Sequence, residues 1–401
     1  MTAELLLKQV RPWAGAVTDI RIQDGYITEV GPALVPIGPT PTMLHGENQI
    51  VLPGLVDAHA HIDKNLLGLP WQPNQVPGPT IQHLVDNERR LRRELGLSAQ
   101  VQSAHQVRAA LAAGTTHIRT HVDIDTEAGL AHFEGVLATR AQFQTEMTMQ
   151  LVAFPQSGMV VRPGTVALLE EALQLGAECI GGLDPSSMDR DPARHLDIIF
   201  ELADRYGVEV DIHLHEPGAL GAFAVELIAE RTRALGLQGR VTISHVFCLG
   251  MIEEEYLQRL LDLLIENRIA IMSLGSGRSA FPPLKRLHDA GVQLCTGTDG
   301  VRDTWGPYNG VDMLERVKLL GYRSGYRRDE EIEMLLTMAT TGGATVMRDS
   351  DYGLSVGKRA DLVVVPGDSV TEAVINRPPR TFVLKQGQLV GKDGVYCGAI
   401  R

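Results

Sequence analysis

The chain has 401 residues, enough for a large barrel with a small second domain. Hydrophobic residues make up 44% and charged residues 21% of the sequence, as in ordinary globular proteins. The formal net charge of −12 argues against nucleic acid and anionic membrane surfaces as partners, because both attract basic proteins. The four cysteines form no CxxC pair, and we see neither a signal peptide nor an apolar run of about 18 residues. We therefore expect a cytoplasmic protein.

Both ends of the chain predict short β-strands. Residues 4–10, 18–23 and 26–31 alternate in the manner of strands, and Asp24-Gly25 between the last two favours a tight hairpin. Residues 360–367, 381–391 and 394–400 repeat this style near the other end. We predict one small β-sandwich domain assembled from residues 1–52 and 352–401, with two unrelated β-segments as the alternative.

The middle of the chain, residues 53–351, alternates apolar strands with amphipathic helices. Residues 165–177 and 253–267 carry apolar side chains at helical spacing. Strands are predicted at residues 52–61, 117–124, 147–155, 179–185, 208–216, 241–247, 269–275 and 292–299. Such alternation predicts a parallel sheet covered by helices, and eight units favour a (β/α)8 TIM barrel as the catalytic domain. No glycine-rich phosphate loop supports a doubly wound sheet instead.

Histidine and aspartate gather at the carboxyl ends of these strands, where barrel enzymes build their active sites. His59 and His61 are two residues apart on the first strand, so their side chains share a face. His213 and His215 repeat the spacing on the fifth strand, and Asp299 ends the eighth. Three imidazoles and one carboxylate, with a position left for water, are typical of a catalytic metal site.

Six segments carry a family resemblance: PGLVDAHAHIDK, RTHVDID, LVAFPQSG, VDIHLHE, ISHVFC and TGTDGVRDTWGPYN. In this order they resemble the amidohydrolase superfamily, within it the cytosine deaminase and N-isopropylammelide isopropylaminohydrolase-like branch. The resemblance implies the metal ligands His59, His61, His213 and Asp299, and the composite β-sandwich. Binuclear members usually have a carboxylated lysine on the fourth strand, but residues 179–185 contain none. We therefore expect one divalent metal ion, Zn or Fe, and the sequence favours neither.

The resemblance also implies catalytic roles. A bound divalent ion lowers the pKa of its water toward about 7, which makes the water a nucleophile near neutral pH. Glu216 resembles the family's proton shuttle between this water and a ring nitrogen, and Asp299 would share the proton while binding the metal. His245 is expected to orient or polarise the nucleophile. His121 and Asp123 are expected to support the ligands through hydrogen bonds.

Five residues are predicted to bind substrate. Gln156 matches the family's contact to the substrate amide, and Lys64 resembles a position used by the triazine-degrading relatives. Asp184 and Trp305 could line the pocket, although a structural Asp-Pro turn and a packed indole explain them equally well. His215 could be a substrate contact, a support for the ligands or an alternative ligand; we favour the first two.

Some departures bear on the substrate. Cytosine deaminase has a second aspartate after the metal-binding one, where this chain has Gly300. Residues 184–189 differ as well, and Arg278 has no obvious role with cytosine. We therefore expect hydrolytic deamination of another amino- or alkylamino-substituted heterocycle. The alternatives are a cyclic-amide hydrolase and, less favoured, a non-catalytic interaction scaffold. The expected partner is a small heterocyclic substrate, and the sequence is compatible with a homo-oligomer. Deaminases with H-x-E and P-C-x-x-C are excluded, because that cysteine pair is missing.

Overall fold

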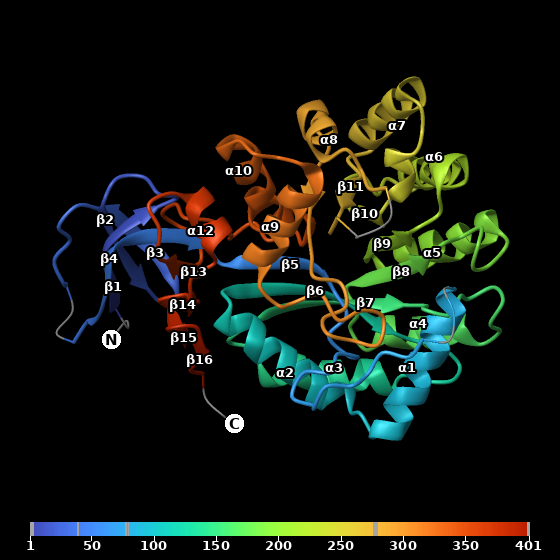
Figure 1. Ribbon diagram of the computed structural model, residues 1–401, viewed down its shortest axis with the longest axis horizontal. Helices are drawn as coiled ribbons and strands as arrows, with labels where there is room; N and C mark the ends of the chain where they lie inside the picture. Colours follow the sequence, from blue (N-terminus) through green and yellow to red (C-terminus); the bar gives the residue numbers. More distant parts are fainter. Residues whose placement is uncertain (1–3, 38–39, 77, 79, 276–279, 399–401) are drawn as a thin grey trace.

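The computed structural model describes residues 4–37, 40–76, 78, 80–275 and 280–398. Two eight-stranded sheets organise these residues (Figure 1). One sheet is all parallel, with strand order β12-β11-β10-β9-β8-β7-β6-β5, and its strands alternate with helices. The other has the order β16-β15-β14-β13-β4-β1-β2-β3 and combines strands from the two ends of the chain.

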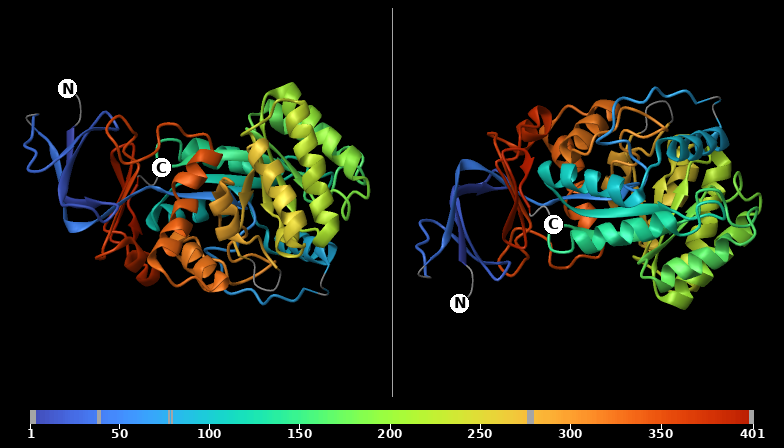
Figure 2. Two further views of the ribbon diagram at one scale, coloured as in Figure 1. Left: turned by 90° about the horizontal axis from the view of Figure 1, so that it is seen from above. Right: turned by 90° about the horizontal axis from the view of Figure 1, so that it is seen from below.

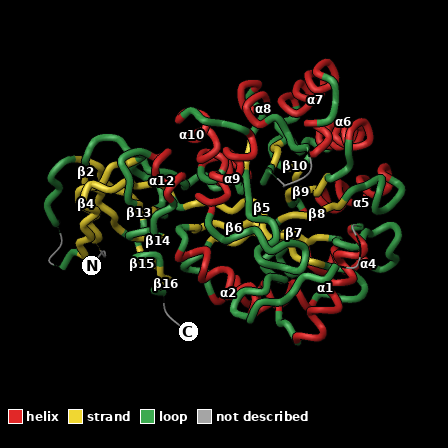
Figure 3. Tube along the Cα trace, in the orientation of Figure 1, coloured by secondary structure: helices red, strands yellow, loops and turns green. Residues whose placement is uncertain are grey.

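The parallel sheet is the predicted (β/α)8 barrel, and its strands are short, apolar and buried. They are β5 (Leu55–Ala60), β6 (Thr115–Asp123), β7 (Thr148–Phe154), β8 (Cys179–Leu183), β9 (Glu209–Leu214), β10 (Val241–His245), β11 (Ala270–Met272) and β12 (Leu294–Cys295). The last two are shorter than predicted, because regular pairing stops before the polar residues at their ends. Helices surround them, as Figure 3 shows in red.

The helices begin and end largely where caps and glycines predict. They are α1 (Ile81–Leu95), α2 (Ala99–Ala112), α3 (Ala131–Gln142), α4 (Thr165–Gln174), α5 (Pro192–Tyr206), α6 (Gly218–Ala234), α7 (Glu254–Glu266), α8 (Leu284–Ala290), α9 (Met313–Ser324), α10 (Asp329–Met338), α11 (Thr341–Val346) and α12 (Val370–Asn376), with a 3-10 turn at Phe247–Gly250. In α5, for example, Asp191 accepts the N–H of Arg194 at the start, and Gly207 ends the helix at φ 65°. Helix α1 is an addition to the regular alternation, because both α1 and α2 lie between β5 and β6 in the chain.

The barrel closes between its first and last strands at the residues predicted to bind metal. Ala60 pairs with Asp299 in a parallel bridge. The N–H of Asp299 donates to the carbonyl of His59 at 2.8 Å, and the N–H of His61 donates to the carbonyl of Asp299 at 3.3 Å. Chain closure therefore brings residues some 240 positions apart to one edge of the barrel.

The terminal sheet joins the two ends of the chain, as predicted. Its strands are β1 (Glu4–Pro12), β2 (Thr18–Gln23), β3 (Tyr26–Gly31), β4 (Thr42–Pro53), β13 (Leu362–Val365), β14 (Phe382–Lys385), β15 (Gln388–Lys392) and β16 (Val395–Tyr396). Figure 2 shows the N-terminal strands and the C-terminal strands as two layers beside the barrel. Leu7 and Ile22 from the first layer share a buried core with Leu362 and Leu384 from the second.

β4 ends at Pro53 and β5 begins at Leu55, so the predicted junction after residue 52 falls one residue before the end of β4. The division into domains at 1–52 with 352–401 and 53–351 stays a prediction, because the two sheets also share a core. Ile50 and Val363 of the terminal sheet belong to the same buried cluster as the barrel residues Leu111 and Val136. Among the described residues, no helix is both long and apolar enough to cross a membrane.

Candidate metal centre and substrate cavity

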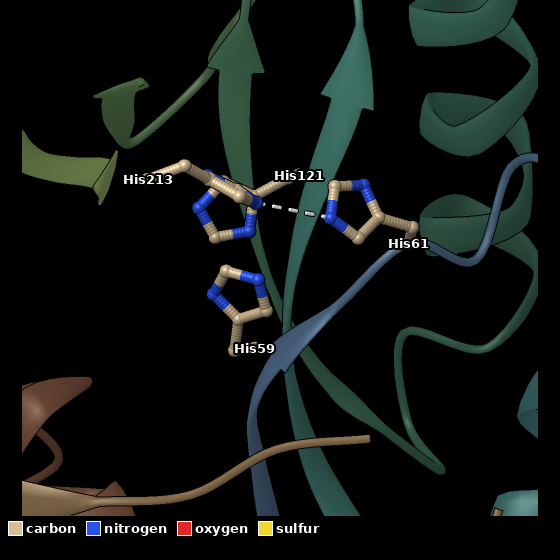
Figure 4. A group of neighbouring side chains, drawn as sticks. All are labelled: His59, His61, His121 and His213. Atoms are coloured by element: carbon tan, nitrogen blue, oxygen red, sulfur yellow. Dashed lines mark hydrogen bonds between the residues drawn. The ribbon is translucent and has the colours of Figure 1, made fainter. Parts of the chain in front are cut away.

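Four histidines converge at the carboxyl edge of the barrel (Figure 4). His59 and His61 come from the end of β5, His121 from β6 and His213 from β9. One ring nitrogen from each lies within 4.8 Å of the others, which is close enough for a shared ion. The Nε2 atoms of His61 and His213 are 3.2 Å apart, so two ring nitrogens face the same point in space.

Asp299 and His245 complete the cluster from the other side. Oδ1 of Asp299 lies 3.3 Å from Nε2 of His61 and 3.8 Å from Nε2 of His59. His59, His245 and Asp299 form a second group whose possible ligand atoms also lie within 4.8 Å of one another. Asp299 adopts φ 61°, and this left-handed backbone turns its carboxylate back toward the histidines.

The ring nitrogens of the cluster are buried without the hydrogen bonds that buried polar atoms normally have. Partners are missing within the described chain for Nε2 of His59, Nδ1 of His61, Nδ1 of His213, and both nitrogens of His121 and His245. Burial lowers the pKa well below the usual histidine value, and positive neighbours reinforce the effect, for His59, His61, His213 and His245. These rings are therefore neutral at physiological pH, which is the form that binds metal. The donor set fits a divalent ion.

A hydrogen-bond chain below the cluster orients His59. Oγ of Ser244 lies 2.7 Å from Oδ1 of Asp211 and 3.0 Å from Nδ1 of His59. Because Asp211 can only accept when ionised, the serine hydroxyl donates to it and accepts from the Nδ1–H of His59. The lone pair of His59 is then on Nε2, the nitrogen that faces the cluster. Such supporting contacts fix the tautomer of metal-binding histidines.

The cluster opens onto a cavity of about 620 Å³. Its walls include eight of the predicted site residues: His61, Lys64, Gln156, His213, His215, His245, Asp299 and Trp305. The other three, His59, Asp184 and Glu216, are buried and are not among the residues that line it. Apolar side chains such as Phe154 and Leu274 line the rest, which suits a flat ring.

Lys64 is buried and already paired. Its Nζ donates to both carboxylate oxygens of Asp123 at 3.0 Å and to Oε1 of Gln156 at 2.5 Å. Burial alone would lower the pKa of Lys64, but Asp123 and Glu88 raise it above its usual value, so the ammonium stays charged. With its oxygen held by Lys64, Gln156 has its amide N–H donors left for a ligand. Lys64 thus positions Gln156.

His215 and Glu216 are held by the loop that follows β8. Nδ1 of His215 lies 2.9 Å from Oδ2 of Asp184, and the N–H of His215 donates to Oδ1 at 2.6 Å. Burial lowers the pKa of His215, but the charge and hydrogen bond of Asp184 outweigh it and raise the pKa overall. Oε1 of Glu216 accepts the N–H groups of Ser186 and Ser187 at 2.7 and 2.6 Å, whereas Oε2 is buried without a partner in the described chain.

The loop after Asp299 supplies a further wall. The indole N–H of Trp305 donates to Oε2 of Glu88 on α1 at 2.6 Å, and Nζ of Lys64 lies 5.6 Å from the ring centroid. Asp303 lines the cavity beside Gly300, and burial raises its pKa to about 7. Arg278 lies outside the described residues.

Sequence reasoning missed several of these relations. His121 was expected to support the ligands by hydrogen bonds; its Nε2 lies 3.4 Å from Oδ1 of Asp211 without making a hydrogen bond, and its ring is itself one of the possible ligands. The sequence shows that His121 lies two residues after Arg119 on the same strand, but it does not show how deeply the His121 ring is buried in the barrel. Ser244, Asp211 and Asp303 were not singled out, because serine and aspartate near strand ends are common and carry no spacing signal.

The fold and the site together define a metal-dependent hydrolase of the amidohydrolase type, and comparison with known proteins supports this class. A model of the amidohydrolase family matches residues 47–391, so the chain belongs to that family. The predicted superfamily, barrel fold and enzyme class, a hydrolase of C–N bonds, are confirmed.

Three individual proteins show further similarity to this chain. It is 43% identical to N-isopropylammelide isopropylaminohydrolase from Burkholderia multivorans, with a TM-score of 0.95 over 98% of this chain and 100% of that one. It is 29% identical to N-isopropylammelide isopropyl amidohydrolase of Pseudomonas sp. strain ADP, over 94% of this chain and 98% of that protein. The fold also matches 5-methylcytosine deaminase from Klebsiella pneumoniae, with a TM-score of 0.86 at 22% identity over 99% of both chains.

Proposed function

We propose that this protein is a metal-dependent aminohydrolase that releases ammonia or an alkylamine from a small amino- or alkylamino-substituted heterocycle. The observation that carries the proposal is the cluster of buried imidazole nitrogens without hydrogen-bond partners in the described chain, at the edge of a cavity large enough for such a heterocycle. The similarity to isopropylaminohydrolases, whose names specify an N-alkylated triazine as substrate, supports the alkylamine form.

We propose that His59, His61, His213 and Asp299 bind one divalent ion, Zn²⁺ or Fe²⁺. The ligand atoms of the three histidines lie within 4.8 Å of one another, and Oδ1 of Asp299 lies 3.3 Å from Nε2 of His61 and 3.8 Å from Nε2 of His59. The absence of lysine from β8 supports a single ion. His121 is the alternative fourth imidazole, because its nitrogen lies within the same cluster. A bound ion would act as a Lewis acid and acidify water at the cavity edge.

The chain's own residues would then bind the ring and move protons. The amide N–H groups of Gln156, oriented by Lys64, would donate to a ring oxo group. Glu216 would take one proton from the attacking water and pass it to the ring nitrogen, because its Oε2 is free while Oε1 is fixed. Asp299 would accept the second proton of that water, and this proton would leave with the departing amine. His245 and His215, stacked with ring centroids 4.4 Å apart, would orient the attacking water and the leaving amine.

The test is amine release from a panel of compounds by protein loaded with Zn²⁺ or Fe²⁺. The panel comprises N-isopropylammelide, cytosine, 5-methylcytosine, a pterin and creatinine, and each reaction is followed for ammonia and isopropylamine. We expect turnover of at least one compound and its loss after chelation. Ring opening without amine release would instead indicate a cyclic-amide hydrolase. Failure to bind about one equivalent of metal would count against an enzyme altogether.

A further inference from the structure

A carboxyl group folds back over the residue that follows Asp299. A Cβ atom placed on Gly300 would lie 1.8 Å from Oδ2 of Asp303 and 2.8 Å from its Cγ. These distances are far below a van der Waals contact, so the Asp303 carboxyl occupies the space of a side chain at position 300. The observed position of Asp303 therefore requires glycine at residue 300.

The loop fixes one oxygen of Asp303 and leaves the other available. Oδ1 accepts the N–H groups of Trp305 at 2.9 Å and Gly306 at 3.0 Å. Oδ2 accepts no hydrogen bond from any residue that the structure describes. Asp303 is 8% exposed, and both it and Gly300 line the substrate cavity next to Asp299.

The nearby cation does not satisfy this oxygen. Lys64 directs its N–H groups to Asp123 and Gln156. The nearby indole N–H of Trp305 is likewise taken, by Glu88. Because Asp303 lines the cavity, this oxygen is open to a bound ligand, and an N–H group of the ligand can donate to it.

We infer that Asp303 is a specificity-determining substrate contact, whose Oδ2 accepts a hydrogen bond from a ring N–H or amino group of the heterocycle. The inference rests on the proposed function and adds the recognition of one edge of the ring. Gln156 supplies donors and Asp303 an acceptor, so the two together suit a ring that carries both an oxo group and an N–H. Gly300 contributes by leaving room for the carboxyl.

The variant Asp303→Asn tests the contact with little change of shape. Its amide oxygen can still accept from Trp305 and Gly306, while an N–H donor replaces Oδ2. With Zn²⁺-loaded protein at about pH 8, above the pKa of Asp303, we expect kcat/KM on N-isopropylammelide to fall about 10–100-fold, the range for removing a hydrogen bond to a charged group. On at least one derivative in which a methyl group replaces a ring N–H, kcat/KM of the variant should fall less than threefold. Metal content and Tm should be unchanged, and Asp289→Asn on the exposed face of α8 is the matched control.

Gly300→Ala tests the same contact from the other side, because its Cβ would displace the carboxyl. We expect it to reproduce the loss and the altered preference of Asp303→Asn. In an Asp303→Ala background, Gly300→Ala should cause no further loss of kcat/KM, since no carboxyl remains to displace. If Asp303→Asn does not fold, this cycle decides the question.

Binding of each compound by isothermal titration calorimetry accompanies the kinetics. Equal losses on N–H and N-methyl compounds, or kcat/KM within twofold of wild type on both, would overturn the role of Asp303. The proposed function would stand in that case if wild-type protein still releases amine. Wild-type protein that neither binds nor turns over any panel compound would overturn both proposals.

Discussion

The buried polar groups at the two ends of the barrel differ in how many hydrogen-bond partners they have. Arg119 and His121 are two residues apart on β6 and point into the same interior. At the amino end, Arg119 donates to the side chains of Gln150, Asp211 and Glu209 and to the carbonyl of Val346. At the carboxyl end, neither ring nitrogen of His121 makes a hydrogen bond within the described chain, and only its Nε2 lies near a carboxylate, 3.4 Å from Oδ1 of Asp211.

This difference separates stability from function along a single strand. A buried charge with a full set of partners holds neighbouring strands together, and removing it leaves the partners uncompensated. A buried ring nitrogen without a partner has an uncompensated desolvation cost, which a bound ligand can remove. Changes at the carboxyl end should therefore affect binding and turnover, whereas changes at the amino end should affect folding.

The largest effect is expected at the carboxyl end. Glu216→Gln preserves shape and can keep the hydrogen bonds from Ser186 and Ser187, but it cannot carry a proton. We expect kcat to fall by about 10²–10⁴-fold, the usual scale for loss of a general acid–base group. Metal analysis and thermal unfolding should match wild type. Undiminished turnover would remove Glu216 from proton transfer and direct attention to His215.

At the amino end, Arg119→Met should destabilise the fold strongly. It leaves Glu209 and Asp211 buried without their cation, which costs about 3–5 kcal/mol in the free energy of unfolding. Urea unfolding of metal-free protein measures this. The exposed Arg205→Met is the control, because its ion pairs are on the surface. A variant as stable as wild type would contradict the assignment of this end to stability.

Ser244 connects the two ends, since it joins His59 to Asp211. Ser244→Ala removes the acceptor that fixes the tautomer of His59. Metal affinity, measured by competition with a chelator, should fall about 10–100-fold while the fold is retained. Ser103→Ala, which removes a buried hydroxyl far from the cluster, should leave metal affinity unchanged. Equal affinities in the two variants would show that His59 needs no such support.

The smallest effect is expected where the barrel meets the terminal sheet. Burial raises the pKa of Asp349, but the hydrogen bond from His117 and the charge of Arg359 hold it below its usual value. Asp349 thus stabilises the fold above its unfolded pKa of about 3.9, and the contribution is lost as the pH falls below that value. Asp349→Asn should cost about 1 kcal/mol at pH 7, and the difference from wild type should shrink between pH 4 and pH 2. A constant difference across this range would exclude the ionised carboxylate as its source.

The sequence predicted those features that depend on spacing along one element. His59 and His61, or His213 and His215, share a face because side chains alternate along a strand, and Asp299 follows the last strand of the barrel. The composite terminal domain followed from the matching strand patterns at both ends. The patterns of the regular strands thus made the barrel and most of the histidine cluster predictable.

Features that depend on loops or on tautomers could not be predicted. The Lys64–Asp123–Gln156 contact joins three strand ends, and nothing in the local pattern shows which donor meets which acceptor. The approach of Asp303 to Gly300 depends on how the loop after Asp299 folds. Lys64 lines the cavity, so its predicted contact with substrate stays a prediction, but the sequence did not show that its Nζ donates to Asp123 and Gln156.

The closing seam of the barrel bears on when the site can form during synthesis. His59 is made early, but its partner strand and Asp299 leave the ribosome some 240 residues later. With the proposed ligands, a nascent chain that ends before Asp299 lacks both the carboxylate and the backbone bonds that align His59 and His61. Full-affinity metal loading is then a late event, restricted to chains whose barrel has been completed. Truncated products would be left without the ion and without the activity that depends on it.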